Sequence, residues 1–241
     1  MANLVRENID RWFEHNLDVD NRTLYMGSVD SIDGNESGVD SFMTEYFVKG
    51  MHVLEAKNHN NVTIIMNNPG GDWYHGMAIY DAIKMAHSHC TIKVYGHAMS
   101  MGSIILQAAD ARVMMPNSRL MIHYGDNQFN NHTKVLEKWM IEERRLCYEM
   151  ENIYLKVMLE KEEKEGHGHL AKTLNQIMSR QKEIEYPSTN KNVTYNFSKK
   201  IETKKEEIRM VLKEMLNFDT ILTAEETVAL GFADEVYKRP E

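Results

Sequence analysis

Hydrophobic and polar positions alternate between two patterns over the first half of the chain. Short apolar runs rich in β-branched residues, which are typical of strands, are separated by stretches in which apolar residues recur every three or four positions, as on one face of a helix. Glycines punctuate the changes from one pattern to the other. The predicted strands are Thr23–Gly27, Val62–Met66, Thr91–Tyr95, Val113–Met115, Leu120–His123 and, near the end, Ala233–Tyr237.

The helical stretches lie between these runs. They are predicted over Glu7–Leu17, Phe42–Lys57, a segment that carries Ile79 and Ala86 on one stripe, and Ser103–Ala109. The run Val62–Met66 is apolar throughout, which favours a strand covered on both faces. Strands that alternate with helices in this way indicate an α/β domain with right-handed crossovers.

Beyond residue 130 the pattern becomes helical and highly charged. A long helix is predicted over about 133–159, with one apolar face formed by Trp139, Leu146, Met150, Ile153 and Val157. The segment 160–208 carries Pro187 and a Ser/Thr/Asn-rich run, and we interpret it as an inserted, solvated helical hairpin with a mobile loop rather than a separate binding domain. We predict one domain over 1–241, with a head of 1–130 and 217–241 and a handle with insertion of 131–216.

Composition and charge narrow the class of protein. A formal net charge of −8 is unlike that of a nucleic-acid-binding surface, which needs a concentrated basic face. No apolar stretch approaches the roughly 20 residues of a membrane-spanning helix, and charged residues fill the start of the chain. The two cysteines, Cys90 and Cys147, are expected to be reduced thiols in a cytoplasmic protein.

One serine combines several features of a nucleophile. Ser100 stands between a predicted strand and a predicted helix, and Gly96 and Gly102 flank it. Tight glycine geometry can expose its hydroxyl, and a helix N-terminus favours negative charge nearby. The same position also suits a serine that only caps the helix. The spacing is not that of a G-x-S-x-G elbow, because Ala98 occupies the first glycine position.

A serine nucleophile needs a base, and the chain has eleven histidines. His123 closes an apolar run and could project from a sheet edge, although a lone histidine at the end of a strand more often has a structural role. Most other histidines, among them His59, lie in polar surroundings and are expected to be solvated, and His87 ends a predicted helix. The pair His167 and His169 has no third ligand nearby, so we predict neither a metal site nor a cofactor.

Five short motifs occur in order between residues 68 and 123. They are Asn68-Pro-Gly-Gly71, Gly76-x-x-Ile79-Tyr-Asp81, Ala98-Met-Ser-Met-Gly102, Pro116-Asn-Ser-Arg119 and Met121-Ile-His123. Together they resemble the successive motifs of the Clp protease proteolytic subunit. The resemblance is strong over about 61–123, weaker before it, and resumes over 219–236. The implied fold is α/β and enoyl-hydratase-like (crotonase-like), a superhelix of β-β-α units with a protruding helical handle.

The resemblance also implies a catalytic triad and an oxyanion hole. Ser100 matches the family nucleophile and His123 the base, while Asp219 matches the third member because it precedes Thr223-Ala-Glu-Glu226. Asp126 is a less favoured substitute. The oxyanion donors implied are the backbone N–H groups of Gly71, or its neighbour Gly70, and of Met101.

By the same resemblance, the chain is expected to be a serine endopeptidase that cleaves peptides or unfolded proteins inside a homo-oligomeric ring, heptameric and single or double. A separate AAA+ ATPase unfoldase is a possible partner, since the chain has no G-x-x-x-x-G-K-[ST] loop. Alternatives are a catalytically idle or capsid-maturation-type relative that forms a ring scaffold, and an acyl-CoA hydratase or isomerase of the same superfamily. Two departures stand out: Tyr124 replaces the proline usual after the histidine, and 96 positions separate His123 from Asp219, roughly twice the family interval.

Overall fold

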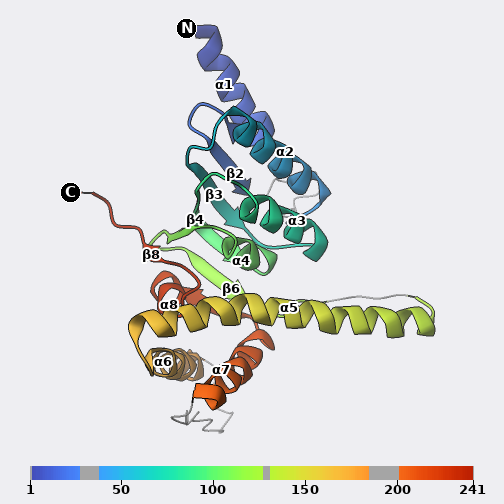
Figure 1. The fold of residues 1–241 in the computed structure, drawn as a ribbon, viewed down its shortest axis with the longest axis vertical. Helices are drawn as coiled ribbons and strands as arrows, with labels where there is room; N and C mark the ends of the chain where they lie inside the picture. Colours follow the sequence, from blue (N-terminus) through green and yellow to red (C-terminus); the bar gives the residue numbers. More distant parts are fainter. Residues whose placement is uncertain (1, 28–37, 127–130, 185–200, 241) are drawn as a thin grey trace. The chain divides into compact units, whose positions relative to one another are not determined.

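The computed structural model describes residues 2–27, 38–126, 131–184 and 201–240 (Figure 1). The chain folds into two compact units. Unit 1 comprises Met1–Met121, Ile221–Glu225 and Ala233–Glu241, and unit 2 comprises Ile122–Thr220 and Glu226–Phe232. The units therefore divide close to His123 and Asp219, whereas the sequence pattern predicted a head and a handle that divide near residues 130 and 217. The predicted Ser/Thr/Asn-rich loop after Pro187 lies outside the described residues.

The described strands join one mixed sheet. Their order is β1-β2-β3-β4-β5-β8, and β6 pairs with both β4 and β7. Strands β1 and β2 are antiparallel, while β2, β3, β4, β5 and β8 run parallel, and β6 is parallel to β4. The strands are β1 (Leu17–Asp18), β2 (Thr23–Gly27), β3 (Val62–Asn68), β4 (Cys90–Met99), β5 (Ala111–Met114), β6 (Arg119–Ile122), β7 (Thr220–Thr223) and β8 (Glu235–Val236).

The helices of unit 1 lie near the sheet, where α2 contacts β2 and α3, and α3 contacts α4 (Figure 1). Helix α1 (Ala2–His15) begins earlier than predicted, and α4 (Met101–Leu106) begins directly after Ser100. The other two are α2 (Ser41–Lys57) and α3 (Trp73–Lys84). Asp40 and Asp72 start α2 and α3, because each carboxylate accepts a backbone N–H of the first turn.

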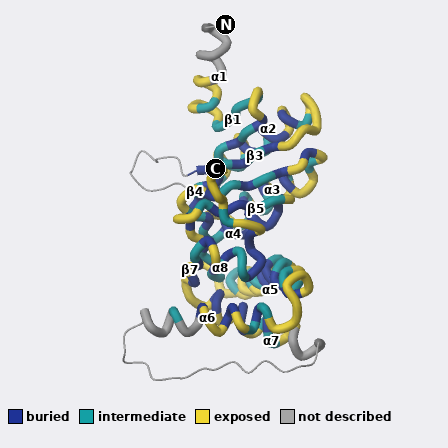
Figure 2. The backbone as a smooth tube through the Cα atoms, turned by 90° about the vertical axis from the view of Figure 1, so that its left-hand side faces the viewer, coloured by how far each residue is buried: buried dark blue, intermediate teal, exposed yellow. Residues whose placement is uncertain are grey.

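The parallel strands of unit 1 carry many of its buried apolar residues (Figure 2). Along β3, buried residues alternate with half-buried ones, starting from Val62. The strand is therefore fully covered on one face and partly covered on the other, whereas its continuous apolar run predicted two covered faces. Helices α2 and α3 contribute Phe47, Met51, Leu54, Ile79 and Ile83 to the buried core of unit 1.

Unit 2 is a helical unit with a core of its own. Its helices are α5 (Thr133–Glu165), α6 (His169–Ile184), α7 (Ile201–Leu216) and the end of α8 (Ala224–Ala229). Helices α6 and α7 both contact α5, and all three bury apolar side chains, so the predicted hairpin is packed rather than solvated. The core includes Met150, Tyr154, Leu155, Met158, Leu170, Leu174, Ile177, Ile208, Val211, Leu212 and Met215.

The buried face of α5 differs from the predicted one. Met150 is buried as expected, but Trp139 is exposed, and Ile153 and Val157 are only half-buried. Tyr154 and Met158 are buried instead, and the Tyr154 ring packs edge-on against Phe232 with 5.4 Å between centroids. The buried face of α5 is therefore rotated relative to the predicted apolar stripe, because helix α7 and Phe232 pack against the neighbouring side of the helix.

The connection from α5 to α6 depends on a buried carboxylate. Glu162 accepts the backbone N–H groups of Gly168 at 2.6 Å and of Leu170 at 2.7 Å, and so satisfies the amino end of α6.

We expect Glu162→Ala to lower the free energy of unfolding by about 2–3 kcal/mol, because it leaves backbone amides at a buried helix end without their acceptor. Urea unfolding followed by circular dichroism measures this change. The adjacent, exposed Glu163→Ala is the matched control, with an expected change within about 0.5 kcal/mol. Equal effects of the two substitutions would contradict the assigned role of Glu162.

Candidate active site

Ser100 occupies a strained turn between β4 and α4. Its backbone has φ 49° and ψ −123°, and positive φ is rare for a residue with a side chain. The Ser100 N–H donates to the carbonyl of Met121 at 2.9 Å, which anchors the turn to β6. Ser100 is the residue before the helix, yet its side chain makes no capping hydrogen bond. Helix capping therefore does not account for this serine, and strain of this kind is characteristic of functional sites.

A two-glycine turn packs directly against Ser100. Gly70 has φ 103°, and a Cβ at this residue would lie 2.5 Å from the Ser100 Cβ and 2.9 Å from the Met101 nitrogen. Gly71 has φ 144°, and a Cβ there would lie 2.4 Å from the backbone of Val39. Both glycines are required, because any side chain would collide with atoms that cannot move aside.

The hydrogen bonds of this turn determine which of its backbone N–H groups are available to bind a substrate oxygen. The Gly70 N–H donates to the side chain of Asn68 at 2.9 Å. Val39 pairs with the turn from the other side, donating to the Gly70 carbonyl and accepting from the Asp72 N–H. Within the described residues, the N–H groups of Gly71 and Met101 have no acceptor. These two amides could hold a negatively charged oxygen next to Ser100.

His123 and Asp219 form a pair within unit 2. The His123 Nδ1 lies 2.9 Å from Oδ1 of Asp219, and the two side chains are 21% and 71% exposed. Asp219 follows α7, and the next residue, Thr220, holds the turn by donating its hydroxyl to the Met215 carbonyl at 2.7 Å. With Nδ1 engaged by a carboxylate, the imidazole is oriented through one nitrogen, as in a base whose other nitrogen accepts a proton.

A buried polar network attaches the residue after His123 to the helices. The Tyr124 N–H donates to the Leu216 carbonyl at 2.9 Å, and the Tyr124 hydroxyl donates to Glu151 at 2.8 Å. Glu151 is buried on α5 and is neutralised by Arg209 at 2.9 Å and Lys213 at 3.7 Å, both on α7. Burial, together with the hydrogen bond to Glu151 and its charge, raises the pKa of Tyr124, so this phenol remains a donor.

Sequence reasoning did not predict this network. The available signals were Tyr124 in place of the usual proline and a glutamate, Glu151, next to the predicted apolar stripe of α5. A carboxylate on a packed helix face needs a partner, and two cations lie one turn apart on α7.

The thiols of Cys90 and Cys147 are poor alternatives to Ser100 as the nucleophile. Burial, with a smaller contribution from Asp110, raises the pKa of Cys90 to about 11. Burial and the nearby Glu143 raise the pKa of Cys147 to about 11 as well. Both therefore stay protonated near neutral pH.

The predicted site residues thus fall into two groups. Ser100, Gly70, Gly71 and Met101 come together in unit 1, and His123 pairs with Asp219 in unit 2. Among the described residues, no helix has both the length and the apolar character needed to cross a membrane.

Comparison with known proteins points to one family. The family model described as Clp protease matches residues 31–167, more than half of the chain. A curated relative is the "ATP-dependent Clp protease proteolytic subunit" of Deinococcus radiodurans, which is 36% identical over 121 residues. This match covers 49% of the chain, and the chain spans 59% of the length of that relative.

We expect Tyr124→Phe to lower the free energy of unfolding by about 1.5–3 kcal/mol, because it removes a hydrogen bond to a buried charged group. Thermal unfolding, compared with the unaltered chain, measures the loss. Tyr148→Phe is the matched control on α5, because its exposed ring keeps the contact with the Arg209 guanidinium, 5.1 Å from the ring centroid. A loss in the control as large as in Tyr124→Phe would show that the network is not the cause.

Proposed function

Because the chain belongs to the Clp protease family, as its motifs predicted, we propose that it is a serine endopeptidase with Ser100, His123 and Asp219 as its triad. Family membership and the mixed parallel sheet also confirm the predicted α/β, crotonase-like fold class. The observation that carries the proposal is the His123–Asp219 pair at 2.9 Å, which joins two residues 96 positions apart in the way a triad requires.

In the proposed reaction, Ser100 attacks the carbonyl carbon of a peptide bond. His123 accepts the hydroxyl proton as the bond forms and later delivers it to the leaving amine. Asp219 holds the imidazole by Nδ1 and stabilises its charged form. The products are an acyl-enzyme on Ser100 and an amine, and water then releases the acyl group by the same steps.

The tetrahedral oxyanion is proposed to bind the N–H groups of Gly71 and Met101. Each such donor typically contributes about 3 kcal/mol to stabilisation of the transition state. Of the two glycines considered from the sequence, Gly71 suits this role better, since the Gly70 N–H already donates to Asn68. Gly70 is instead proposed to allow the close approach of the turn to Ser100.

Their places in the sequence are consistent with the proposed roles of Ser100 and His123. The Ser100 N–H donates to the carbonyl of Met121, and only Ile122 separates Met121 from His123 in the sequence.

We extend the proposal to partners in line with the family. The substrates are peptides or unfolded proteins, and the chain assembles as a homo-oligomeric ring, heptameric and single or double. The exposed apolar residues Trp139, Met140 and Ile141 on α5 support assembly, because solvent-facing apolar patches mark interaction surfaces. A separate AAA+ ATPase would supply ATP-driven unfolding, and the cytoplasm remains the predicted location.

We expect a fluorophosphonate probe to label Ser100 in the unaltered chain. Labelling should disappear in Ser100→Ala and slow at least about 100-fold in His123→Ala, because the hydroxyl loses its base. Intact-mass spectrometry measures the extent and rate. The exposed His132→Ala, also in unit 2, is the matched control and should label at the unaltered rate. Unchanged labelling in both Ser100→Ala and His123→Ala would contradict the proposed roles of Ser100 and His123. If the unaltered chain is not labelled at all, a catalytically idle ring scaffold is indicated instead.

A further inference from the structure

Three potential metal ligands converge in unit 1, away from the residues discussed above. Glu55 lies near the carboxyl end of α2, His59 follows the end of that helix, and His87 lies in the segment between α3 and β4. The nearest imidazole nitrogens, Nδ1 of His59 and Nδ1 of His87, lie 3.3 and 3.5 Å from the same carboxylate oxygen, Oε2 of Glu55. All three potential ligand atoms lie within 4.8 Å of one another.

These separations suit a shared metal ion better than hydrogen bonds. Both contacts exceed the 2.7–3.2 Å range of ordinary N–H···O bonds. Zinc bonds to histidine nitrogen and carboxylate oxygen are about 2.0–2.2 Å long, which at tetrahedral angles puts ligand atoms about 3.3–3.5 Å apart. The two imidazoles, 60% and 79% exposed, can make the remaining small adjustment without disturbing the core.

The carboxylate of Glu55 is held in place by hydrogen bonds. Its Oε2 accepts the His87 N–H at 2.8 Å, and its Oε1 accepts the N–H and the hydroxyl of Ser88.

Further hydrogen bonds hold Ser88, which in turn orients the Glu55 carboxylate. The buried guanidinium of Arg22 donates to the Ser88 hydroxyl at 2.9 Å and to the Leu54 carbonyl at 2.8 Å. Arg22 thereby ties the segment after α3 to the end of α2. Ligands supported in this way are characteristic of metal centres.

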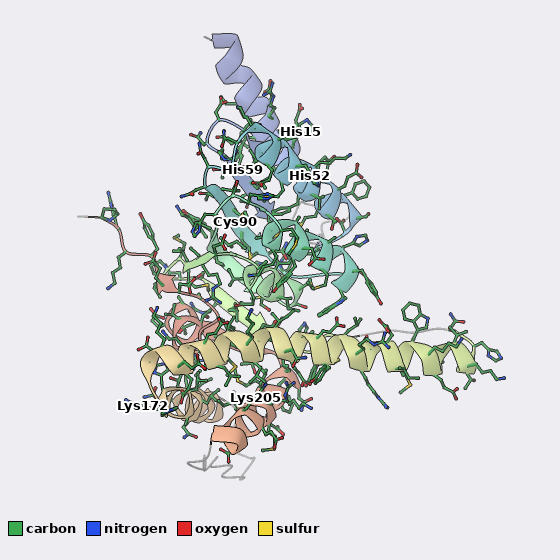
Figure 3. The ribbon with its side chains drawn as sticks, viewed as in Figure 1. His15, His52, His59, Cys90, Lys172 and Lys205 are labelled. Carbon is green, nitrogen blue, oxygen red and sulfur yellow. The ribbon has the colours of Figure 1, made fainter. Side chains whose placement is uncertain are left out.

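We propose that Glu55, His59 and His87 bind one divalent transition-metal ion of the zinc type, with water completing its coordination. Two imidazoles and one carboxylate are a ligand set that Zn²⁺ accepts readily. Figure 3 labels His59, in the segment after α2, and Cys90, the first residue of β4. No metal ligand was expected from the sequence, because His87 is distant in the chain and no motif joins the three residues.

The position of the cluster indicates a structural role. His59 precedes β3 and His87 precedes β4, so both lie at the amino ends of these parallel strands. Ser100 and the two-glycine turn follow the carboxyl ends of the same strands, about 20 Å away for a seven-residue strand. The metal ion would therefore join the start of β3 to the start of β4 and take no part in peptide cleavage.

The test uses the full chain without a histidine tag, stripped with a chelator and dialysed. Isothermal titration with Zn²⁺ measures stoichiometry and affinity, and Co²⁺ absorption reports the coordination geometry. Three proteins are compared: the unaltered chain, the ligand variant His59→Ala/His87→Ala, and the control variant His52→Ala/His89→Ala. Each control histidine is exposed and lies in or beside the same segment as a proposed ligand.

We expect the unaltered chain and the control variant to bind one Zn²⁺ with equal affinity and to gain thermal stability. The ligand variant should lose at least about 100-fold in affinity and show no such gain. Absence of saturable binding to the unaltered chain, or equal binding by the ligand variant, would overturn the proposal. Circular dichroism and fluorophosphonate labelling confirm that the ligand variant is folded, and failure of labelling in every protein would count against the peptidase alone.

Discussion

The approach of the Gly70 backbone to the Ser100 side chain is the constraint on which the rest of the candidate site depends. Only a hydrogen atom fits between them, since a Cβ on Gly70 would lie 2.5 Å from that of Ser100. Ser100 itself keeps a backbone conformation that typically costs about 1–3 kcal/mol, and its bond to Met121 and the start of α4 hold it there. Two segments that follow neighbouring parallel strands are thereby held close together.

The second unit meets a different requirement, which is to hold an imidazole against a largely exposed carboxylate. An isolated surface pair of this kind contributes little and is easily separated. Here both partners are fixed through their neighbours. Tyr124 bonds to Leu216 at the end of α7, Thr220 bonds back to Met215, and the Tyr124 hydroxyl reaches the buried Glu151. Helix α7 therefore has a part in positioning this pair, because Asp219 follows it after two residues.

Much of this arrangement could be predicted because it depends on local sequence. The bounds of β2 match the predicted Thr23–Gly27, and the glycines around Ser100 indicated its turn. Long-range hydrogen bonds could not be predicted in the same way. The sequence motifs do not show that the Asn68 side chain accepts the Gly70 N–H. They also do not show that the Tyr124 hydroxyl donates to Glu151. The buried face of α5 was also misplaced, since periodicity locates an apolar stripe without showing which flank a later helix covers.

The same hydrogen bonds bear on the alternative of an acyl-CoA hydratase or isomerase. That chemistry would need a carboxylate near the oxyanion donors, to move protons on the substrate. Among the described residues, the acidic side chains adjacent in sequence to this turn and to its partner Val39 are Asp72, which follows Gly71, and Asp40. Asp72 accepts the His75 N–H at 2.9 Å and Asp40 the Met43 N–H at 2.8 Å, so each starts a helix. A carboxylate that caps a helix is directed toward backbone amides and is poorly placed to act as a base. The residue in the strained turn between β4 and α4 is instead Ser100, whose side chain makes no helix-capping hydrogen bond.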